Sequence, residues 1–248
     1  MVIDNILDLV EDTMDKFESY VNEEIEKHSD VLTPELLKEK KFKVFRTSDV
    51  IIFGSDLVEN GNYRKRYGYK QIKTAVIDHF HQWTFVPFRA SMSYYTTDGK
   101  IDIQRLEIVI NSSAIVHEII DHLPILETYT NYLLKVHAAH EVGHILDYVS
   151  NDGMSAETYE QQSINDSKEK SDYYKWEREY LDESYKKKIT DSAEIQRINR
   201  EISERYYQLG SEWRADTLGG VDRQKYLDVV YDPKTPMSIK IEPIKNGE

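Results

Sequence analysis

Residues 136–148 read Val-His-Ala-Ala-His-Glu-Val-Gly-His-Ile-Leu-Asp-Tyr, and they contain the pattern His-Glu-x-x-His at His140, Glu141 and His144. No proline interrupts this region, and apolar residues recur in it at helical spacing: Tyr129, Leu133, Val136, Val142, Ile145 and Val149. Residues four apart share one face of a helix, so the imidazoles of His140 and His144 point toward a common position. The stretch therefore predicts a helix from about residue 126 to residue 149 that carries two histidine ligands for a metal ion.

The order of residues inside the pattern points to zinc. Zinc binds neutral imidazoles and lowers the pKa of a bound water to about 7, which supplies a nucleophile near neutral pH. Glu141 stands on the edge of the same helical face, where its carboxylate can reach that water without binding the metal itself. We therefore expect Zn2+ as cofactor, His140 and His144 as ligands, and Glu141 as general base.

A catalytic zinc site needs a third protein ligand and one open position. The downstream stretch Gly210–Gly220 offers Glu212 and Asp216, which are four residues apart and therefore share a helical face. Glu212 is suited to bind the metal, and Asp216 is suited to accept the second ring N–H of a ligand histidine and so fix its tautomer. Three nearer acids are alternatives for the third ligand: Asp147, Glu157 and Glu160.

With these two motifs the chain resembles the gluzincin branch of the zinc metallopeptidases, in which His-Glu-x-x-His is followed on a later helix by a glutamate ligand. Thermolysin-like members carry Glu-x-x-x-Asp there, as residues 212–216 do, and the Ala-Asp pair also resembles the anti-repressor peptidases of mobile elements. The resemblance implies a zincin-like fold and the ligand set His140, His144 and Glu212, with Glu141 as base and Asp216 as the histidine's partner. It covers two short motifs only, and the 67 residues between His144 and Glu212 exceed the thermolysin-like spacing.

Three more residues are candidates for stabilising a developing oxyanion or for lining the cleft. His137 stands three residues before His140, on the ligand face of the helix. Tyr206 and Tyr207 precede Glu212 by two turns or less, and a phenol can hydrogen-bond a tetrahedral oxyanion. The alternative for His137 is a partly exposed helix histidine without a functional role. The alternative for the two tyrosines is ordinary packing, since the chain contains 18 tyrosines.

Strand patterns come before the predicted zinc helix. Phe42–Phe45 and Val50–Phe53 read as short strands, and Thr97-Asp98-Gly99 predicts a hairpin that joins Ser91–Thr96 to Lys100–Ile110. The alternation of apolar residues changes phase inside the second arm, which predicts a β-bulge near Gln104-Arg105. Lys100–Ile110 is either an edge strand that holds an extended substrate by main-chain pairing or an ordinary core strand.

Most of the remaining chain is predicted to be helical. Residues 1–30 are predicted to form an amphipathic helix that either packs on the core or serves as an interaction helix or inhibitory lid, and Thr33 and Pro34 begin a second helix. Further predicted elements are helices at 69–83, 113–122, Ser155 to about Lys188 and Ala193–Asp216, and a short strand with an irregular tail in 226–248.

These patterns predict an α+β fold with a small mixed sheet, an edge strand before the zinc helix, and a mainly helical second half, and the resemblance implies that this fold is zincin-like. Residues 1–40, which carry 12 acids and 4 lysines, form an acidic helical segment. Residues 41–248 form the catalytic domain, with a helical insertion at about 155–190.

Composition limits the classes of function. The 248-residue chain has no cysteine, which excludes disulfides and thiolate zinc ligands. Its net charge of −13 disfavours a nucleic-acid partner and favours neutral or basic substrates. The amino terminus lacks the features of a secretory signal and no apolar run approaches the length of a membrane span, so we expect a cytoplasmic protein without a membrane partner.

The expected function is zinc-dependent hydrolysis of peptide bonds in a protein or peptide substrate. One alternative is a non-catalytic interaction or structural protein of a phage or mobile element that keeps the zincin fold. Another is a zinc hydrolase that acts on a substrate other than a peptide, because the same ligand set permits it.

Overall fold

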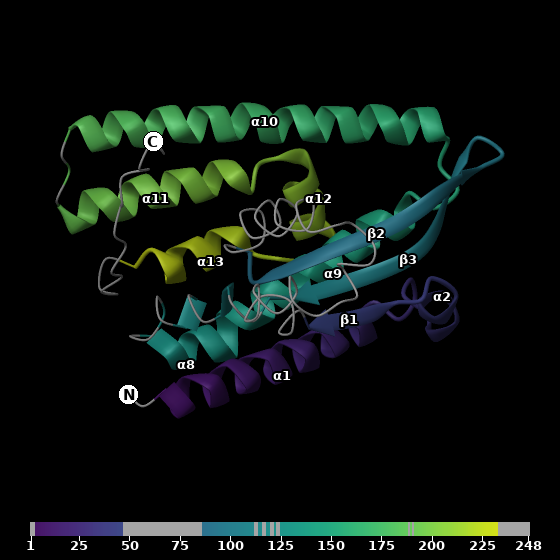
Figure 1. The fold of residues 1–248 in the computed structure, drawn as a ribbon, viewed down its shortest axis with the longest axis horizontal. Helices are drawn as coiled ribbons and strands as arrows, with labels where there is room; N and C mark the ends of the chain where they lie inside the picture. Colours follow the sequence, from purple (N-terminus) through teal and green to yellow (C-terminus); the bar gives the residue numbers. More distant parts are fainter. Residues whose placement is uncertain are drawn as a thin grey trace, which may run out of the picture.

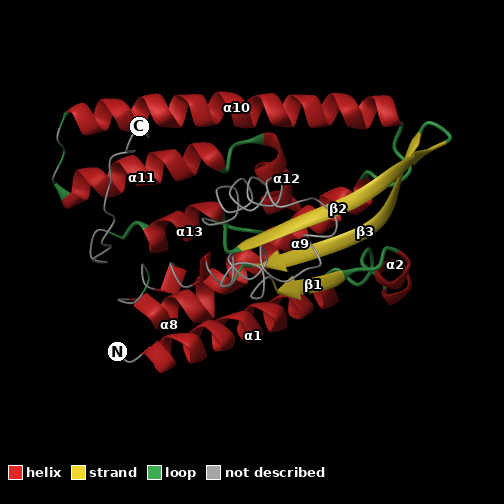
Figure 2. Cartoon of the chain, in the orientation of Figure 1, coloured by secondary structure: helices red, strands yellow, loops and turns green. Residues whose placement is uncertain are grey.

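The structure is a computed structural model that describes residues 3–46, 86–111, 125–187 and 191–232, with positions 114–115, 118–119, 122 and 189. The fold of these residues is mixed α+β and mostly helical, with a three-stranded sheet (Figure 2). The first elements are α1 (Ile3–Lys27), α2 (Pro34–Glu39), β1 (Lys43–Arg46), β2 (Phe88–Thr97) and β3 (Lys100–Ile110). Then come α8 (Leu126–Thr128), the π-helical turn η2 (Tyr129–Leu133), α9 (Leu134–Ser150), α10 (Ala156–Lys186), α11 (Ser192–Tyr206), α12 (Gly210–Gly219) and α13 (Arg223–Val230).

The sheet has the strand order β1-β3-β2, in which β3 pairs in parallel with β1 and antiparallel with β2. The predicted hairpin is confirmed: Asp98 and Gly99 both have a positive φ, of 51° and 72°, as a two-residue turn between twisted strands requires. The predicted bulge is also confirmed. Ser93 pairs with Arg105 and Tyr94 with Ile103, so Gln104 is the extra residue.

The central position of β3 decides between the two alternatives for Lys100–Ile110 in favour of a core strand. On the side away from β2, its last four residues pair with β1. Farther back on that side, the N–H of Leu106 donates to Lys40 O, and the N–H of Ile103 donates to the Asp152 carboxylate. An incoming peptide therefore has no open edge there. Among the described residues the sheet has two edge strands, β1 and β2, and β2 is the one that contacts α9.

Helix α1 belongs to the hydrophobic core. Val10, Met14, Phe17 and Val21 are buried, and the ring of Phe17 stacks on that of Phe88 in β2 with the centroids 3.7 Å apart. The helix runs along α9 (Figure 1), and the Tyr20 hydroxyl donates to Thr130 O over 3.2 Å. Of the two alternatives for residues 1–30, this geometry favours a helix packed on the core.

The helix around His-Glu-x-x-His and the following long helix are both confirmed. The chain is helical without interruption from Leu126 to Ser150, through the π-helical turn of η2. Helix α10 then takes up the segment predicted from Ser155 to about Lys188 and lies beside α11 (Figure 1). The predicted start of α2 is confirmed as well, since Thr33 caps the helix through its side chain and Pro34 is its first residue.

Two predicted elements are wrong in part. The single helix at Ala193–Asp216 is two helices, because residues 207–209 leave the helix and Leu209 adopts an extended ψ of 140° before α12 begins. The sequence predicts a short strand and an irregular tail within residues 226–248, but residues 226–230 are helical, within α13, whose first turn is capped by the Asp222 side chain.

Some predicted elements fall outside the residues that the structure describes. They are the strand Val50–Phe53, the helix at 69–83, and the tail beyond residue 232. Of the helix predicted at 113–122, the described positions 114–115 and 118–119 are helical, and position 122 is a turn.

Candidate metal centre

The two motif helices, α9 and α12, approach each other through glycines. A Cβ on Gly143 would overlap the carbonyl oxygen of Ala215, and a Cβ on Gly219 would overlap the carbonyl oxygen of Ala139. Only small residues at this crossing let the two backbones lie so close. The approach places the buried acids Glu212 and Asp216 directly against the histidines of α9.

His140, His144 and Glu212 form a compact cluster, with one donor atom of each within 4.8 Å of the others. The Nε2 atoms of His140 and His144 lie 3.3 and 3.5 Å from Glu212 Oε2. Ligands at zinc-binding distances stand roughly 3.3–3.6 Å apart at the corners of a tetrahedron. The spacing and chemistry of these donors therefore fit a zinc ion, although the same donor set also suits other divalent transition metals.

The charges of the cluster stabilise one another. Burial alone would lower the pKa of His140, but its hydrogen bonds with Asp216 and Glu212 raise that pKa to about 9. Burial would raise the pKa of Glu212, but hydrogen bonds with His140 and His144, together with the charge of Lys170, hold it well below its usual range. Glu212 is therefore ionised, as a metal ligand must be.

Asp216 lies behind His140, in the place predicted for a histidine partner. Its Oδ1 is 2.7 Å from His140 Nδ1, which leaves Nε2 directed at the cluster. Arg223 Nε donates to Asp216 Oδ2 over 2.8 Å, and the guanidinium lies 3.4 Å above the ring centroid of Tyr207. Burial would raise the pKa of Asp216, but the hydrogen bonds with Arg223 and His140 lower it, so Asp216 remains an acceptor.

Glu141 is buried between α9 and the edge strand β2. Its Oε2 accepts a hydrogen bond of 2.5 Å from the backbone N–H of Ala90. Glu141 follows the proposed ligand His140 directly in the chain and is not one of the three donors of the cluster.

The alternative third ligands lie elsewhere. Asp147 is buried, but its carboxylate is paired with Arg214 Nε, 3.1 Å from each oxygen. Glu157 and Glu160 are exposed on α10. Among the described residues, Glu212 is the acid that the fold brings to the two histidines.

The candidate residues for oxyanion stabilisation have different surroundings. His137 packs against the rings of Phe88 and Tyr226, with centroids 5.7 and 5.6 Å away. The ring of Tyr207 contacts that of His140, with centroids 5.9 Å apart, and burial raises the pKa of Tyr207 to about 12. Tyr206 packs against Tyr173 and Tyr207, so its surroundings favour ordinary packing over a role at the oxyanion.

Sequence reasoning missed three residues of the centre. Tyr148 stacks on His144 with a centroid distance of 6.2 Å, and its position four residues after His144 was the available signal. Arg223 and Lys170, which contact Asp216 and Glu212, come from other helices and carry no local signal.

No protein-family model matches the chain, and comparisons with curated proteins and with solved structures find no significant match. None of the helices among the described residues is both long and apolar enough to span a membrane.

Proposed function

We propose that this protein is a zinc-dependent metallopeptidase with a zincin-like fold. The observation that carries the proposal is the convergence of two imidazole Nε2 atoms and one carboxylate oxygen, from His140, His144 and Glu212, at separations suited to a tetrahedral ion. The acid Asp216 behind His140 adds support, because ligand histidines usually donate their second N–H to such a group.

Each residue then has a defined task. His140, His144 and Glu212 hold the ion, which when bound supplies a Lewis acid that polarises a carbonyl and lowers the pKa of a water. Glu141 accepts the proton of the attacking water and delivers it to the nitrogen of the departing amine. The hydrogen bond from Ala90 N holds one oxygen of Glu141, which keeps the other oriented for this transfer.

The substrate is an extended peptide laid along β2. The N–H of Ala90 faces Glu141 and not β3, so this side of the strand adjoins the proposed base. Because backbone groups of residues two apart face the same side of a strand, main-chain pairing along this side would bring the scissile bond beside Glu141. The net charge of −13 favours neutral or basic segments.

Metal content is the first part of the test. Elemental analysis of the purified protein should find about one zinc ion per chain, and His140→Ala and Glu212→Ala should each lose it. Glu160→Ala is the matched control, because it removes an exposed acid that competed for the role of third ligand, and it should keep the zinc. A wild-type protein that binds no zinc even when zinc is supplied refutes the proposal.

Hydrolysis is the second part. The wild type should cleave an unfolded protein such as casein, and Glu141→Gln should lower the rate by about 10²–10⁴-fold while the zinc content stays unchanged. Zinc binding without cleavage of any peptide, in the wild type, would favour the rival function of an interaction or structural protein, or a hydrolase for another substrate class.

A further inference from the structure

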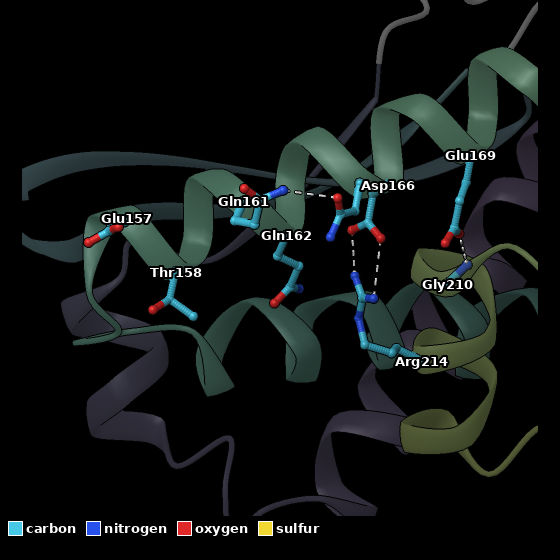
Figure 3. Close-up of a pocket in the computed structure, with 9 residues that line it drawn as sticks. Glu157, Thr158, Gln161, Gln162, Asp166, Glu169, Gly210 and Arg214 are labelled. Atoms are coloured by element: carbon cyan, nitrogen blue, oxygen red, sulfur yellow. Dashed lines mark hydrogen bonds and ion pairs between the residues drawn. The ribbon is translucent and has the colours of Figure 1, made fainter.

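The first turn of α12, which carries Glu212, is held by polar groups from the long helix α10. Leu209 precedes α12 and has no side-chain oxygen with which to cap it. The cap comes from α10 instead: the Gly210 N–H donates to Glu169 Oε2 over 2.8 Å (Figure 3).

A second link lies one turn farther along α12 and one turn earlier on α10. Arg214 donates to Asp166 of α10, with Nη2 2.6 Å from Oδ2, and also to Asp147 of α9. In Figure 3 the side chain of Arg214 reaches up from α12 to meet Asp166, beside the bond between Glu169 and Gly210. The turn that carries Glu212 is therefore fixed on both sides by α10.

The third link reaches the proposed ligand itself. Lys170 Nζ lies 2.8 Å from Glu212 Oε1, and the Ser211 hydroxyl donates to the same oxygen over 3.2 Å. The two imidazoles lie against the other oxygen, Oε2. Asp166, Glu169 and Lys170 follow one another at positions i, i+3 and i+4, so all three project from one face of α10.

We infer that Lys170 is a positioning residue for the metal site: it occupies Oε1 of Glu212 so that this carboxylate offers the metal one oxygen. This inference rests on the proposed metal centre. A carboxylate with both oxygens free can bind an ion through both, which adds a donor and moves the site away from tetrahedral geometry. The ammonium makes a charge-assisted hydrogen bond, which is strong enough to hold a buried carboxylate in one orientation.

The test is cobalt substitution of the full-length protein, because tetrahedral Co2+ absorbs visible light more strongly than five-coordinate Co2+. Lys170→Met keeps the length of the side chain and removes its charge. We expect a weaker visible absorption of its Co2+ form, and a zinc affinity that is lower by about 10–100-fold, measured by competition with a chelating dye. Lys170→Arg keeps a cationic donor and should restore the wild-type spectrum. The matched control is Lys168→Met, which removes an exposed lysine two residues earlier on α10.

Each outcome decides the inference. A Lys170→Met spectrum and zinc affinity equal to those of the wild type would overturn it and leave the proposed metal centre intact. An equal change in Lys168→Met would also overturn it, since the effect would then be a general one of surface charge. A wild type that binds neither cobalt nor zinc would refute the metal centre, and the inference with it.

Discussion

Gly143 of α9 and Gly219 of α12 face each other, and a Cβ built on Gly219 would lie 3.5 Å from the Cα of Gly143. Each glycine also lies against backbone of the opposite helix, at Ala215 and Ala139, and backbone cannot move aside as a side chain can. The distance between the two helices, and hence the reach of Glu212 to the histidines, depends on these two residues having no side chain.

The substitution Gly143→Ala should therefore separate the helices and disrupt the metal centre, although it leaves His-Glu-x-x-His intact. We expect a loss of about 1–3 kcal/mol in the free energy of unfolding from overpacking, and loss of most of the bound zinc. Urea denaturation and elemental analysis measure the two effects. Thr217→Ala is the control, because it changes an exposed residue of the same helix α12. Equal zinc content in Gly143→Ala and the wild type would contradict the proposed role of the crossing.

Arg214 is expected to stabilise the fold by neutralising the buried carboxylate of Asp147, which it contacts at 3.1 Å. In Arg214→Met that carboxylate stays buried without its partner, and we expect a loss of about 2–3 kcal/mol in the free energy of unfolding. Adding Asp147→Leu removes the unpaired buried carboxylate, so the double variant should be more stable than Arg214→Met alone in urea denaturation. A double variant no more stable than the single one would show that the pairing with Asp147 is not the cause.

His137 should make the stability of the metal-free protein depend on pH. Burial and the nearby charge of Arg223 lower the pKa of His137 to about 3, against about 6.5 in the unfolded chain. Between these values the unfolded chain binds a proton that the folded protein does not. The contribution of neutral, buried His137 to the free energy of unfolding is therefore fully present above pH 6.5. It is lost as the pH falls toward 3, by at most about 1.4 kcal/mol per pH unit.

The variant His137→Phe removes this proton and keeps an aromatic ring between Phe88 and Tyr226. Its free energy of unfolding should fall less steeply than that of the wild type from pH 6.5 to pH 4.5, in urea titrations with a chelator present. If the free energies of unfolding of the two proteins fell equally steeply with pH, His137 would be protonated in the folded protein, and the prediction would be wrong.

Several features could be predicted from the sequence because each depends on residues near one another in the chain. The spacing of four places His140 beside His144, and Glu212 beside Asp216, on any helix. The Asp98-Gly99 turn and the phase change in β3 follow from the same kind of local geometry. The sequence by itself thus determined the two motif faces, the hairpin with its bulge, and the long helix after the first motif.

Only the tertiary structure decided which acid meets the histidines, because that depends on how their two helices approach each other, and 67 residues lie between His144 and Glu212. Asp147 was a nearer candidate by position, but it is paired with Arg214, while the crossing at Gly143 and Gly219 brings Glu212 to the site. Packing between distant segments likewise decided the edge position of β2 and the ion pair between Lys170 and Glu212. The physical reason is that contacts across a core follow from the combined packing of many side chains, which no local spacing specifies.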